Sequence, residues 1–345
     1  MNKVLKRLII FIIIVGLLVI VLGGGLYALN KPADPNDNSY RIVTVKQGYA
    51  TADIASALKD KGLISNEKSY KIMSKVFRYD GKYQAGTYSF QPSMRPREIA
   101  DKIVKGKVNS ISFTIPEGYT IKQISNTLEK NKICKAKEFL DACNTTKFDK
   151  KYGFLKDAQS GENHLEGFLS PNTYQVGEDS TPDQIIETML AQTDRIWGKK
   201  YIKKAKDMGY TINDITIIAS IIEREAAIED DMAKISSVIY NRIKKNMPLQ
   251  VDATVEYALG VHKDVLSISD TQIDSPYNTY KVNGLPKGPI SAPGKAAIKA
   301  ALYPESTDYL YYVLSGKLDG SHVFTSNDAD FEKAKKEYVD AVSKK

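Results

Sequence analysis

The first half of the chain repeats itself, and this repeat limits the possible folds more than any other feature of the sequence. The stretch VTVKQGYATADIASALKDKGLI (Val43–Ile64) aligns without a gap on FTIPEGYTIKQISNTLEKNKIC (Phe113–Cys134), at an offset of 70 residues. A second pair of similar stretches, Ala85–Val104 and Pro171–Leu190, has an offset of 86 because residues are inserted in the second copy. The first half therefore consists of two copies of one structural unit.

Each copy has the pattern of a small unit of strands and helices. A short alternating stretch precedes a Gly-Tyr pair, and apolar residues at helical spacing follow it, such as Ile54 and Leu58. A second strand then leads to a helix with proline in its first turn, Pro96 in the first copy and Pro182 in the second. Such units suit sugar-polymer binding and plain scaffolding equally, so the pattern alone leaves both open.

The N-terminal segment predicts a membrane anchor. Leu8 to Leu29 is a run of 22 residues without a charge, which as a helix is about 33 Å long, enough to cross a bilayer core. Lys3, Lys6 and Arg7 precede it, so the N-terminus is predicted to be cytoplasmic and the rest of the chain extracellular. A cleaved signal peptide would have a shorter apolar region and a small-residue cleavage site, so the run favours an uncleaved anchor.

Charge and composition exclude some functions and leave others open. The net charge of +8 fits either a solvated lysine-rich surface or attraction to an anionic cell wall or membrane, and an exported chain is not expected to bind nucleic acid. Two cysteines, Cys134 and Cys143, are too few for a disulfide framework, and whether they pair is left open. Three scattered histidines have no metal-ligand spacing, so no metal site is expected.

Residues 211–246 predict two helices, and the first carries the candidate catalytic residue. We expect Asn213 to cap it, and Ile215–Ile222 is almost wholly apolar and therefore buried. Glu223 follows this run, so its carboxyl is expected to be partly desolvated, with a raised pKa suited to a general acid. Glu225 points to another face of the helix, so the two glutamates are not expected to form a two-carboxylate site.

A plainer interpretation of Glu223 also stands. The helix end emerges into solvent, or Glu223 pairs with a cation, for which Arg224, Lys234 and Arg242 are candidates. The next helix, Met232 to about Lys245, has an apolar stripe typical of a core. Beyond it the chain is polar, aromatic and rich in turns, and we expect long functional loops there. Six of their residues have side chains of the kind that grip sugars: Gln250, Asp252, Thr254, Tyr277, Asn278 and Tyr280.

Several motifs occur in a fixed order along the chain. Those of the second half are ASIIEREA (Ala219–Ala226), VIYNRIKKNMPLQVDATVEYALG (Val238–Gly260), SPYNTYKVNGLPKGPISAPGKAAIKAALYP (Ser275–Pro304) and YLYYVLSGKLDGSHVFTSN (Tyr309–Asn327). Those of the first half are QAGTYSF (Gln84–Phe90), IPEGYT (Ile115–Thr120) and LEGFLSPNTY (Leu165–Tyr174). In this order and spacing they resemble the YceG-like endolytic murein transglycosylases.

The resemblance implies an α+β fold with a single N-terminal transmembrane helix, a LysM-like βα repeat module and a mixed α/β catalytic domain outside the membrane. It implies these limits: cytoplasmic N-terminus 1–7, transmembrane helix 8–29, linker 30–39, LysM-like first repeat 40–108, second repeat 109–195 and catalytic domain 196–345, with a cleft shared with 160–195. No cofactor is implied. The implied partners are peptidoglycan glycan strands, peptidoglycan synthases and the elongation or division machinery.

The resemblance also implies a reaction. Such enzymes cut the β-1,4 bond between N-acetylmuramic acid and N-acetylglucosamine within a strand, and the catalytic glutamate of the family falls on Glu223. One carboxyl protonates the leaving oxygen and then accepts the proton of the muramoyl C6 hydroxyl, which closes a 1,6-anhydro ring. Glu166, in LEGFLSPNTY, matches a family motif and is predicted to line the cleft or to tie the repeat to the catalytic domain.

Two alternatives differ in what they predict. A hydrolytic muramidase that uses Glu223 with Asp252 as its second carboxylate would release reducing ends instead of anhydro ends. A non-catalytic wall-binding scaffold would not depend on Glu223 at all.

Overall fold

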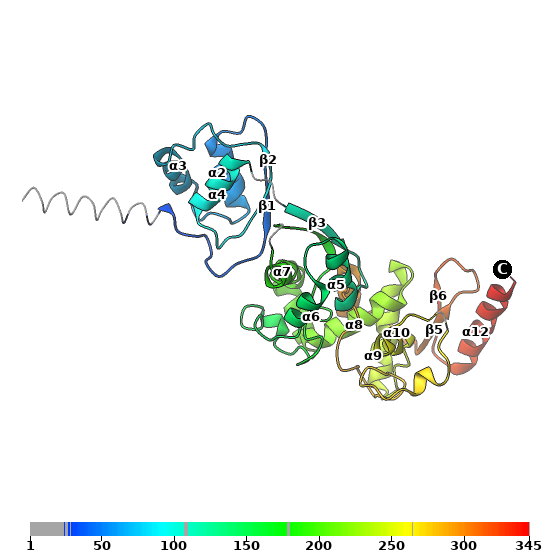
Figure 1. Ribbon diagram of the computed structural model, residues 1–345. Coiled ribbons are helices and arrows are strands. Elements are labelled where there is room, and N and C mark those ends of the chain that lie inside the picture. Colours follow the sequence, from blue (N-terminus) through cyan, green and yellow to red (C-terminus); the bar gives the residue numbers. More distant parts are fainter. Residues whose placement is uncertain are drawn as a thin grey trace, which may run out of the picture. The chain divides into compact units, whose positions relative to one another are not determined.

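The computed structural model describes residues 24, 27, 29–106, 110–177, 180–263 and 265–344 (Figure 1). The chain divides into two compact units. The first comprises Met1–Ser112 with Gln175–Ser180, and the second comprises Phe113–Tyr174 with Thr181–Lys345. Both contain helices and short two-stranded sheets, which confirms the expected mixed α+β character. The finer domain limits inferred from the sequence stay predictions.

The predicted membrane span, residues 8–29, lies almost wholly outside the described residues. Within the part of the chain that the structure describes, none of the helices combines the length and apolar content needed to cross a bilayer. The anchor and the orientation that follows from it therefore stay predictions.

The first unit packs three helices against a two-stranded sheet. Strand β1 (Arg41–Val45) pairs antiparallel with β2 (Gly86–Phe90), so that Val43 lies opposite Tyr88. The helices are α2 (Thr51–Asp60), α3 (Glu67–Val76) and α4 (Pro96–Lys105). Their buried faces and the sheet form one core, whose members include Ile54, Leu58, Met73, Tyr88, Phe90, Ile99 and Ile103.

The second copy of the repeat has the same order of elements. Strand β3 (Ser110–Ile115) pairs with β4 (Asn172–Gly177), and the helices are α5 (Ile121–Lys130), α6 (Ala136–Cys143) and the start of α7 (Pro182–Asp207), which is kinked at Gly198. The strand, helix, strand and proline-started helix predicted for each copy are thus confirmed. Helices α3 and α6, which occupy matching places in the two copies, were not predicted.

The shared Gly-Tyr pair marks the same turn in both copies. Gly48 has a φ of 83° and Gly118 a φ of 76°, in the left-handed region that glycine adopts without steric cost. Each turn ends a strand and starts a helix, α2 in one copy and α5 in the other. The positive φ of this turn therefore explains why both copies have glycine at this position.

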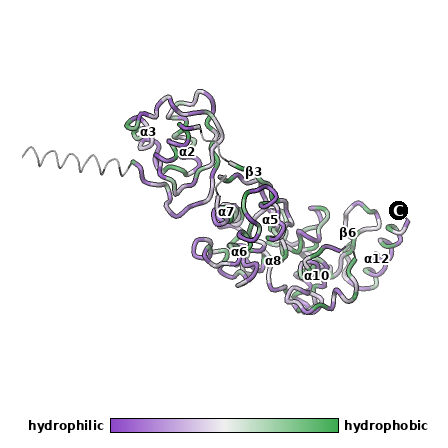
Figure 2. The backbone as a smooth tube through the Cα atoms, viewed as in Figure 1, coloured by the Kyte–Doolittle hydropathy of each residue, from purple (hydrophilic) through white to green (hydrophobic). Residues whose placement is uncertain are grey.

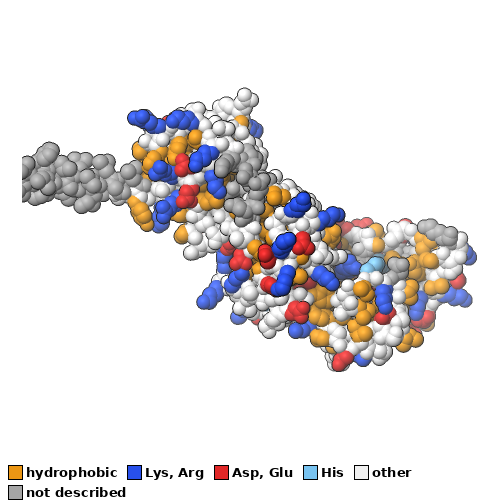
Figure 3. Space-filling view, viewed as in Figure 1, with side chains coloured by type: hydrophobic (Ala, Val, Ile, Leu, Met, Phe, Trp, Pro, Cys, Tyr) orange, Lys and Arg blue, Asp and Glu red, His pale blue; other side chains and the backbone are white. Residues whose placement is uncertain are grey.

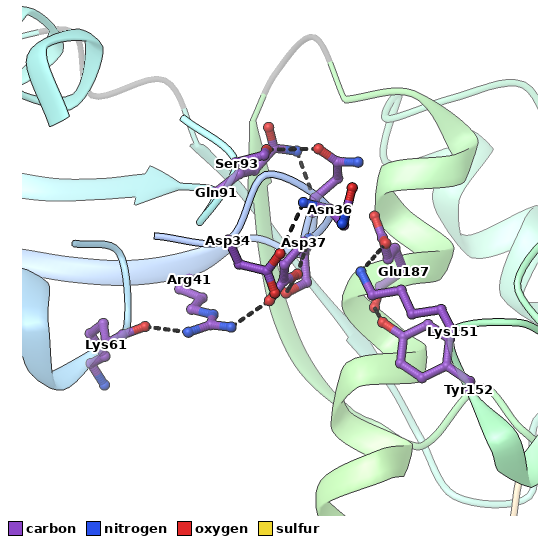
Figure 4. Close-up of polar contacts among 12 residues, drawn as sticks. Asp34, Asn36, Asp37, Arg41, Lys61, Gln91, Ser93, Lys151, Tyr152 and Glu187 are labelled. Carbon is purple, nitrogen blue, oxygen red and sulfur yellow. Dashed lines mark hydrogen bonds and ion pairs between the residues drawn. The ribbon is translucent and has the colours of Figure 1, made fainter. Parts of the chain in front are cut away.

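Ionic and polar contacts fix loops within each unit (Figure 4). In the first unit, the Arg41 guanidinium bonds the Asp37 carboxylate and donates to the Lys61 carbonyl at 2.6 Å. In the second unit, the inserted segment carries Lys151, which pairs with Glu187 of α7. The ion pair between Lys151 and Glu187 holds the inserted segment against α7. The insertion also contains a 3₁₀ turn, Gly153–Leu155.

The rest of the second unit is built around a buried helix. It contains α8 (Ile212–Glu225), α9 (Met232–Lys244), α10 (Asp252–Leu259), α11 (Lys295–Leu302), the antiparallel pair β5 (Tyr311–Leu314) and β6 (His322–Thr325), and α12 (Asp328–Ser343), with 3₁₀ turns at Glu229–Asp231 and Asp270–Gln272. Side chains of α7, α8, α9 and α11 share one core, which includes Trp197 at 1% exposure. Figure 2 shows hydrophobic and hydrophilic residues interspersed along the helices of each unit.

Two local expectations were wrong. Helix α8 is capped by Thr211, whose hydroxyl accepts from the Asp214 N–H at 3.0 Å, and Asn213 lies inside the first turn. The polar stretches after α9 are not wholly loops, because α10 and β6 form within them. Both elements are short, so they offer little hydrophobic periodicity to recognise. The apolar stripe of α9 is buried in the core, as expected.

Charged side chains are dispersed over the surface that Figure 3 shows, with Asp and Glu among the Lys and Arg of each unit. This favours the solvated-surface interpretation of the positive charge for that face. The two cysteines, Cys134 and Cys143, are free thiols, and Cys143 is buried.

Candidate active site

Glu223 lies in the last turn of α8, directly after the part of the helix that is buried on all sides. Every residue from Ile215 to Ile222 is buried, whereas Glu223 is half-buried. The apolar run fixes the helix in the core of the second unit and holds the glutamate at the edge of that core. The position of Glu223 thus follows from the packing of α8.

A loop that precedes α11 covers the end of α8. The Ile290 N–H donates to the Ser220 hydroxyl at 3.0 Å, and the Ser291 hydroxyl donates to the Ser220 carbonyl at 3.3 Å. These bonds bring Gly294, the N-cap of α11, to Glu223, where its N–H donates to Oε2 at 2.8 Å. The carboxylate therefore lies at the N-terminus of a helix, where the backbone dipoles stabilise negative charge.

The Gly-Tyr turn of the second repeat forms a further side of the site. The Gly118 N–H donates to the Ala292 carbonyl at 2.9 Å, and the Ala292 N–H donates to the Tyr119 carbonyl at 2.7 Å. A Cβ on residue 118 would lie 3.8 Å from Cγ of Glu223. A reciprocal pair of backbone hydrogen bonds therefore holds the turn on the loop before α11, beside Glu223.

The surroundings raise the pKa of Glu223 above its ordinary value. The largest cause is burial, which disfavours the charged form, and the negative charge of Glu117 acts in the same direction. The hydrogen bond from Gly294 and the charge of Arg224 act in the opposite direction and are outweighed. Glu223 therefore keeps its proton to a higher pH than a solvated glutamate does, as a general acid requires.

The cations named as possible partners of Glu223 are engaged elsewhere. Arg224 pairs with Glu256 at 3.6 Å and Lys234 with Asp231 at 3.7 Å. The Arg242 guanidinium is buried and donates to backbone carbonyls, one of them at 2.6 Å. No ion pair to Glu223 occurs among the described residues, so the plainer interpretation of this carboxyl as an ion-pair partner finds no support.

Glu225 forms a separate group on another face of α8. Its Oε2 accepts from the Tyr312 hydroxyl at 2.9 Å, and burial raises its pKa to about 7. The charge of Asp252 contributes to that rise, and Asp252 itself accepts from the Tyr280 hydroxyl at 2.5 Å. The separation of the two glutamates onto different faces agrees with the expectation from helical geometry.

Glu166 is buried, at 2% exposure, and joins two parts of the second unit. Its carboxylate accepts from the Ile121 N–H at 3.1 Å and from the Tyr257 hydroxyl at 3.0 Å. Burial raises its pKa to about 7. Glu166 thereby ties the start of α5 to α10, and its contacts are structural in this conformation.

The other six predicted substrate-binding residues lie in two different environments. Gln250 and Asp252 are exposed and Tyr277 and Tyr280 are half-buried, so their side chains border solvent. Thr254 and Asn278 are fully buried. The Thr254 hydroxyl donates to the Val251 carbonyl at 2.6 Å, and the Asn278 amide donates to the Ile273 carbonyl at 2.8 Å.

In the described part of the chain, no hydrogen bond or ion pair joins any of the seven predicted binding residues to Glu223. Their role in binding substrate stays a prediction. The described residues also contain no group of His, Cys, Asp and Glu able to hold a metal ion.

Comparison with known proteins decides the family. The model of the YceG-like family matches residues 43–337. The chain belongs to the YceG-like family. The endolytic murein transglycosylase of Bacillus subtilis (strain 168) is 34% identical, over 94% of this chain and 93% of that protein. The endolytic murein transglycosylase of Streptococcus pneumoniae serotype 2 is 31% identical, over 90% of this chain and 60% of that protein.

A solved structure is also similar to this YceG-like chain. The crystal structure of a yceG-like protein from Listeria monocytogenes has 34% sequence identity and a TM-score of 0.59, and the match covers 86% of this chain and 99% of that one. The resemblance inferred from the motifs is thus confirmed.

Sequence reasoning missed several residues around Glu223 and Glu225 of this YceG-like protein. Glu117 and Gly118 lie in IPEGYT and Gly294 lies in ISAPGK, both within recognised motifs but without an assigned role. Tyr312, the donor to Glu225, lies in an aromatic stretch typical of a strand. In both IPEGYT and ISAPGK, a glycine lies next to a charged residue just before a helix. This pattern is the signal that could have identified the two segments as part of the site.

Proposed function

We propose that this protein is an endolytic lytic transglycosylase of peptidoglycan, with Glu223 as its catalytic acid and base. The observation that carries the proposal is the half-buried Glu223 carboxyl, whose pKa is raised by burial and whose Oε2 is oriented by the Gly294 N–H. The activity named for the curated relatives at 31% and 34% identity supports it. The bond cut is the β-1,4 bond between N-acetylmuramic acid and N-acetylglucosamine within a strand.

One carboxyl is sufficient for both steps of this reaction. Protonated Glu223 gives its proton to the glycosidic oxygen as the bond from that oxygen to the muramoyl C1 breaks. The resulting carboxylate accepts the proton of the C6 hydroxyl as the C6 oxygen bonds to C1 and closes the anhydro ring. Because no water is consumed, a second carboxylate is not needed to activate one, in contrast to hydrolytic glycosidases.

The location proposed for this activity is the outer face of the cell membrane. The uncharged segment 8–29 would anchor the chain with a cytoplasmic N-terminus, and residues 40–108 would form a LysM-like module that binds glycan. An anchored enzyme of this kind would act on nascent strands beside peptidoglycan synthases and the elongation or division machinery, and would end strand elongation.

The test is mass spectrometry of the glycan products released from purified peptidoglycan by the full-length protein. Glu223→Gln keeps the size of the side chain and removes the acid, so cleavage should fall by at least about a thousand-fold, given the contribution expected of an acid and base used twice. The matched control is Glu229→Gln, which changes an exposed glutamate six residues along the chain and should cut at the wild-type rate.

Three outcomes separate the candidate functions. Internal fragments with 1,6-anhydro ends that require Glu223 support a lytic transglycosylase. Hydrated reducing ends would instead support the muramidase with Asp252 as its second carboxylate. Absence of cleavage by a folded wild-type protein would overturn both and favour a wall-binding scaffold.

A further inference from the structure

The turn between β3 and α5 brings a second carboxylate close to Glu223. The Glu117 carboxylate occupies the space that a Cβ on residue 294 would take, and the N–H of the same residue, Gly294, donates to Glu223 at 2.8 Å. Because both contacts are made to one residue, standard backbone dimensions place the two carboxylates within about 7 Å of each other. At that distance, the charge of one carboxylate acts directly on the proton of the other.

The turn fixes the backbone of Glu117, whose exposed side chain reaches over Gly294. The reciprocal hydrogen bonds between Gly118, Tyr119 and Ala292 hold the turn on the loop that carries Gly294. Two residues after this pair, the Ile121 N–H is bonded to the buried Glu166 carboxylate. Glu117 therefore projects from a turn that is held on both sides.

The other charged groups around Glu223 do not duplicate this effect. Arg224, on α8 itself, lowers the pKa of Glu223 but is drawn toward Glu256 of α10 at 3.6 Å. Lys295, the first residue of α11, is exposed. Glu117, from the turn before α5, is the one group of like charge that acts on Glu223 from an element packed against it in the described part of the second unit.

We propose that Glu117 is a positioning residue for the proton of Glu223: its negative charge, located over Gly294, favours the protonated form of the Glu223 carboxyl before the reaction begins. The inference rests on the proposed function. Glu117 makes Glu223 hold its proton until the glycosidic oxygen receives it. After bond cleavage, the same repulsion makes the Glu223 carboxylate a stronger base toward the C6 hydroxyl.

The first copy of the repeat shows that an uncharged residue fits at the position of Glu117. In the first copy of the repeat, the position equivalent to Glu117 is Gln47, and the turn there has the same left-handed glycine, Gly48. Glutamine is thus compatible with the turn. The substitution Glu117→Gln is therefore expected to leave the fold intact and to remove the charge alone.

The test compares full-length wild type, Glu117→Gln and Glu117→Asp in two measurements. The first is the pH dependence of the cleavage rate. A general acid acts while it is protonated, so activity falls as the pH rises through the pKa of Glu223. Loss of the neighbouring negative charge lowers that pKa, and Coulomb interaction across this distance predicts a shift of the alkaline midpoint to lower pH by about 0.5 to 1.

Above the wild-type midpoint, this shift corresponds to about a three- to ten-fold lower rate. Glu117→Asp keeps the charge and should restore most of the wild-type profile. Gly294→Ala keeps the N–H that binds Glu223 but places a Cβ where the Glu117 carboxylate lies, so it should shift the midpoint in the same direction. Glu138→Gln, which changes an exposed glutamate of α6, is the control and should leave the midpoint in place.

The second measurement follows the protonation of Glu223 directly and does not depend on glycan cleavage. Infrared difference spectroscopy during a pH titration, with Glu223→Gln as the reference, reports the protonated carboxyl band of Glu223. A midpoint that moves in Glu117→Gln supports the inference even if the wild type cuts no glycan, in which case only the proposed function fails. A midpoint unchanged in both measurements, in a variant that unfolds at the wild-type temperature, would overturn it.

Discussion

The turn at Gly167 supports the loop that carries Gly294 to the candidate active site, so we expect Gly167→Ala to reduce both stability and glycan cleavage. Gly167 has a φ of 81°, and an added Cβ would lie 2.5 and 2.8 Å from Cβ and Cγ of Pro289 and 2.9 Å from Cγ2 of Thr216. Pro289 directly precedes the segment that bonds Ser220 and carries Gly294. A shift of Pro289 is therefore transmitted to the donor that orients Glu223.

The magnitude follows from two separable costs. A non-glycine residue in the left-handed region costs about 1–2 kcal/mol, and overpacking against neighbours that cannot retreat freely costs about 1–3 kcal/mol more. Gly167→Ala should therefore lose about 2–5 kcal/mol of unfolding free energy. The matched control is Gly161→Ala, because Gly161 has a φ of 90° with no atom within 4 Å of an added Cβ, and it should lose only about 1–2 kcal/mol.

The assay is urea unfolding followed by tryptophan fluorescence. Trp197 is the single tryptophan of the chain and lies in the core of the second unit, so the signal reports on the unit that contains both glycines. With a slope of about 1–3 kcal/mol per molar urea, the two variants should have clearly different midpoints. Glycan cleavage under native conditions should fall in Gly167→Ala and remain near wild type in Gly161→Ala.

Equal urea midpoints for Gly167→Ala and Gly161→Ala would refute the reasoning, because the contact of the added Cβ with Pro289 would then have no energetic cost. A Gly167→Ala variant that is destabilised yet cuts at the wild-type rate would refute the second part. In that case, the loop before α11 would hold Gly294 in place without help from the turn.

Three further predictions concern polar groups of the second unit. Burial raises the pKa of Glu166 from 4.5 to about 7, so between these pH values the folded protein binds more protons than the unfolded chain does. The unfolding free energy should therefore fall as the pH rises from about 5 to 7. Glu166→Gln should reduce that fall, by at most about 3 kcal/mol in urea titrations at the two pH values, and an unchanged slope would contradict the assignment. Tyr312→Phe removes the donor to the half-buried Glu225 carboxylate and should cost about 1–3 kcal/mol at pH 8 and less at pH 6, where Glu225 is mostly protonated; an equal loss at both values would argue against it. Thr254→Val should lower the urea midpoint through the lost bonds to Val251 and Thr279, whereas Asp252→Asn, at an exposed site, should change KM and shift that midpoint much less.

The sequence was sufficient to predict elements whose periodicity is long or repeated. The two copies of the repeat predicted each other, because a turn that needs glycine in one copy needs it in the other. The wholly apolar stretch before Glu223 predicted a buried helix, since no other environment accepts such a run. In each case a local pattern carried the prediction.

The parts that could not be predicted depend on contacts between distant residues. Helix α10 has eight residues and is stabilised by its surroundings, including the Tyr257 hydroxyl bond to Glu166, which no local pattern reveals. Thr254 and Asn278 have side chains suited to sugars, but the folded chain buries both to satisfy its own backbone carbonyls. The place of Glu117 beside Glu223 depends on a pairing between residues 118 and 292, which only the folded chain shows.

That pairing has a consequence for when the protein becomes active. Gly118 and Ala292, which bond each other, are separated by more than half of the chain, and closing so long a loop has an entropic cost. In a chain synthesised from its N-terminus, the residues of the β3–α5 turn and of α8 are added before residue 292. Glu223 can therefore meet Gly294 only after most of the second unit has been synthesised. A molecule truncated before residue 290 would keep Glu223 but lack the bond from Gly294, and we expect such a molecule to cut glycan poorly.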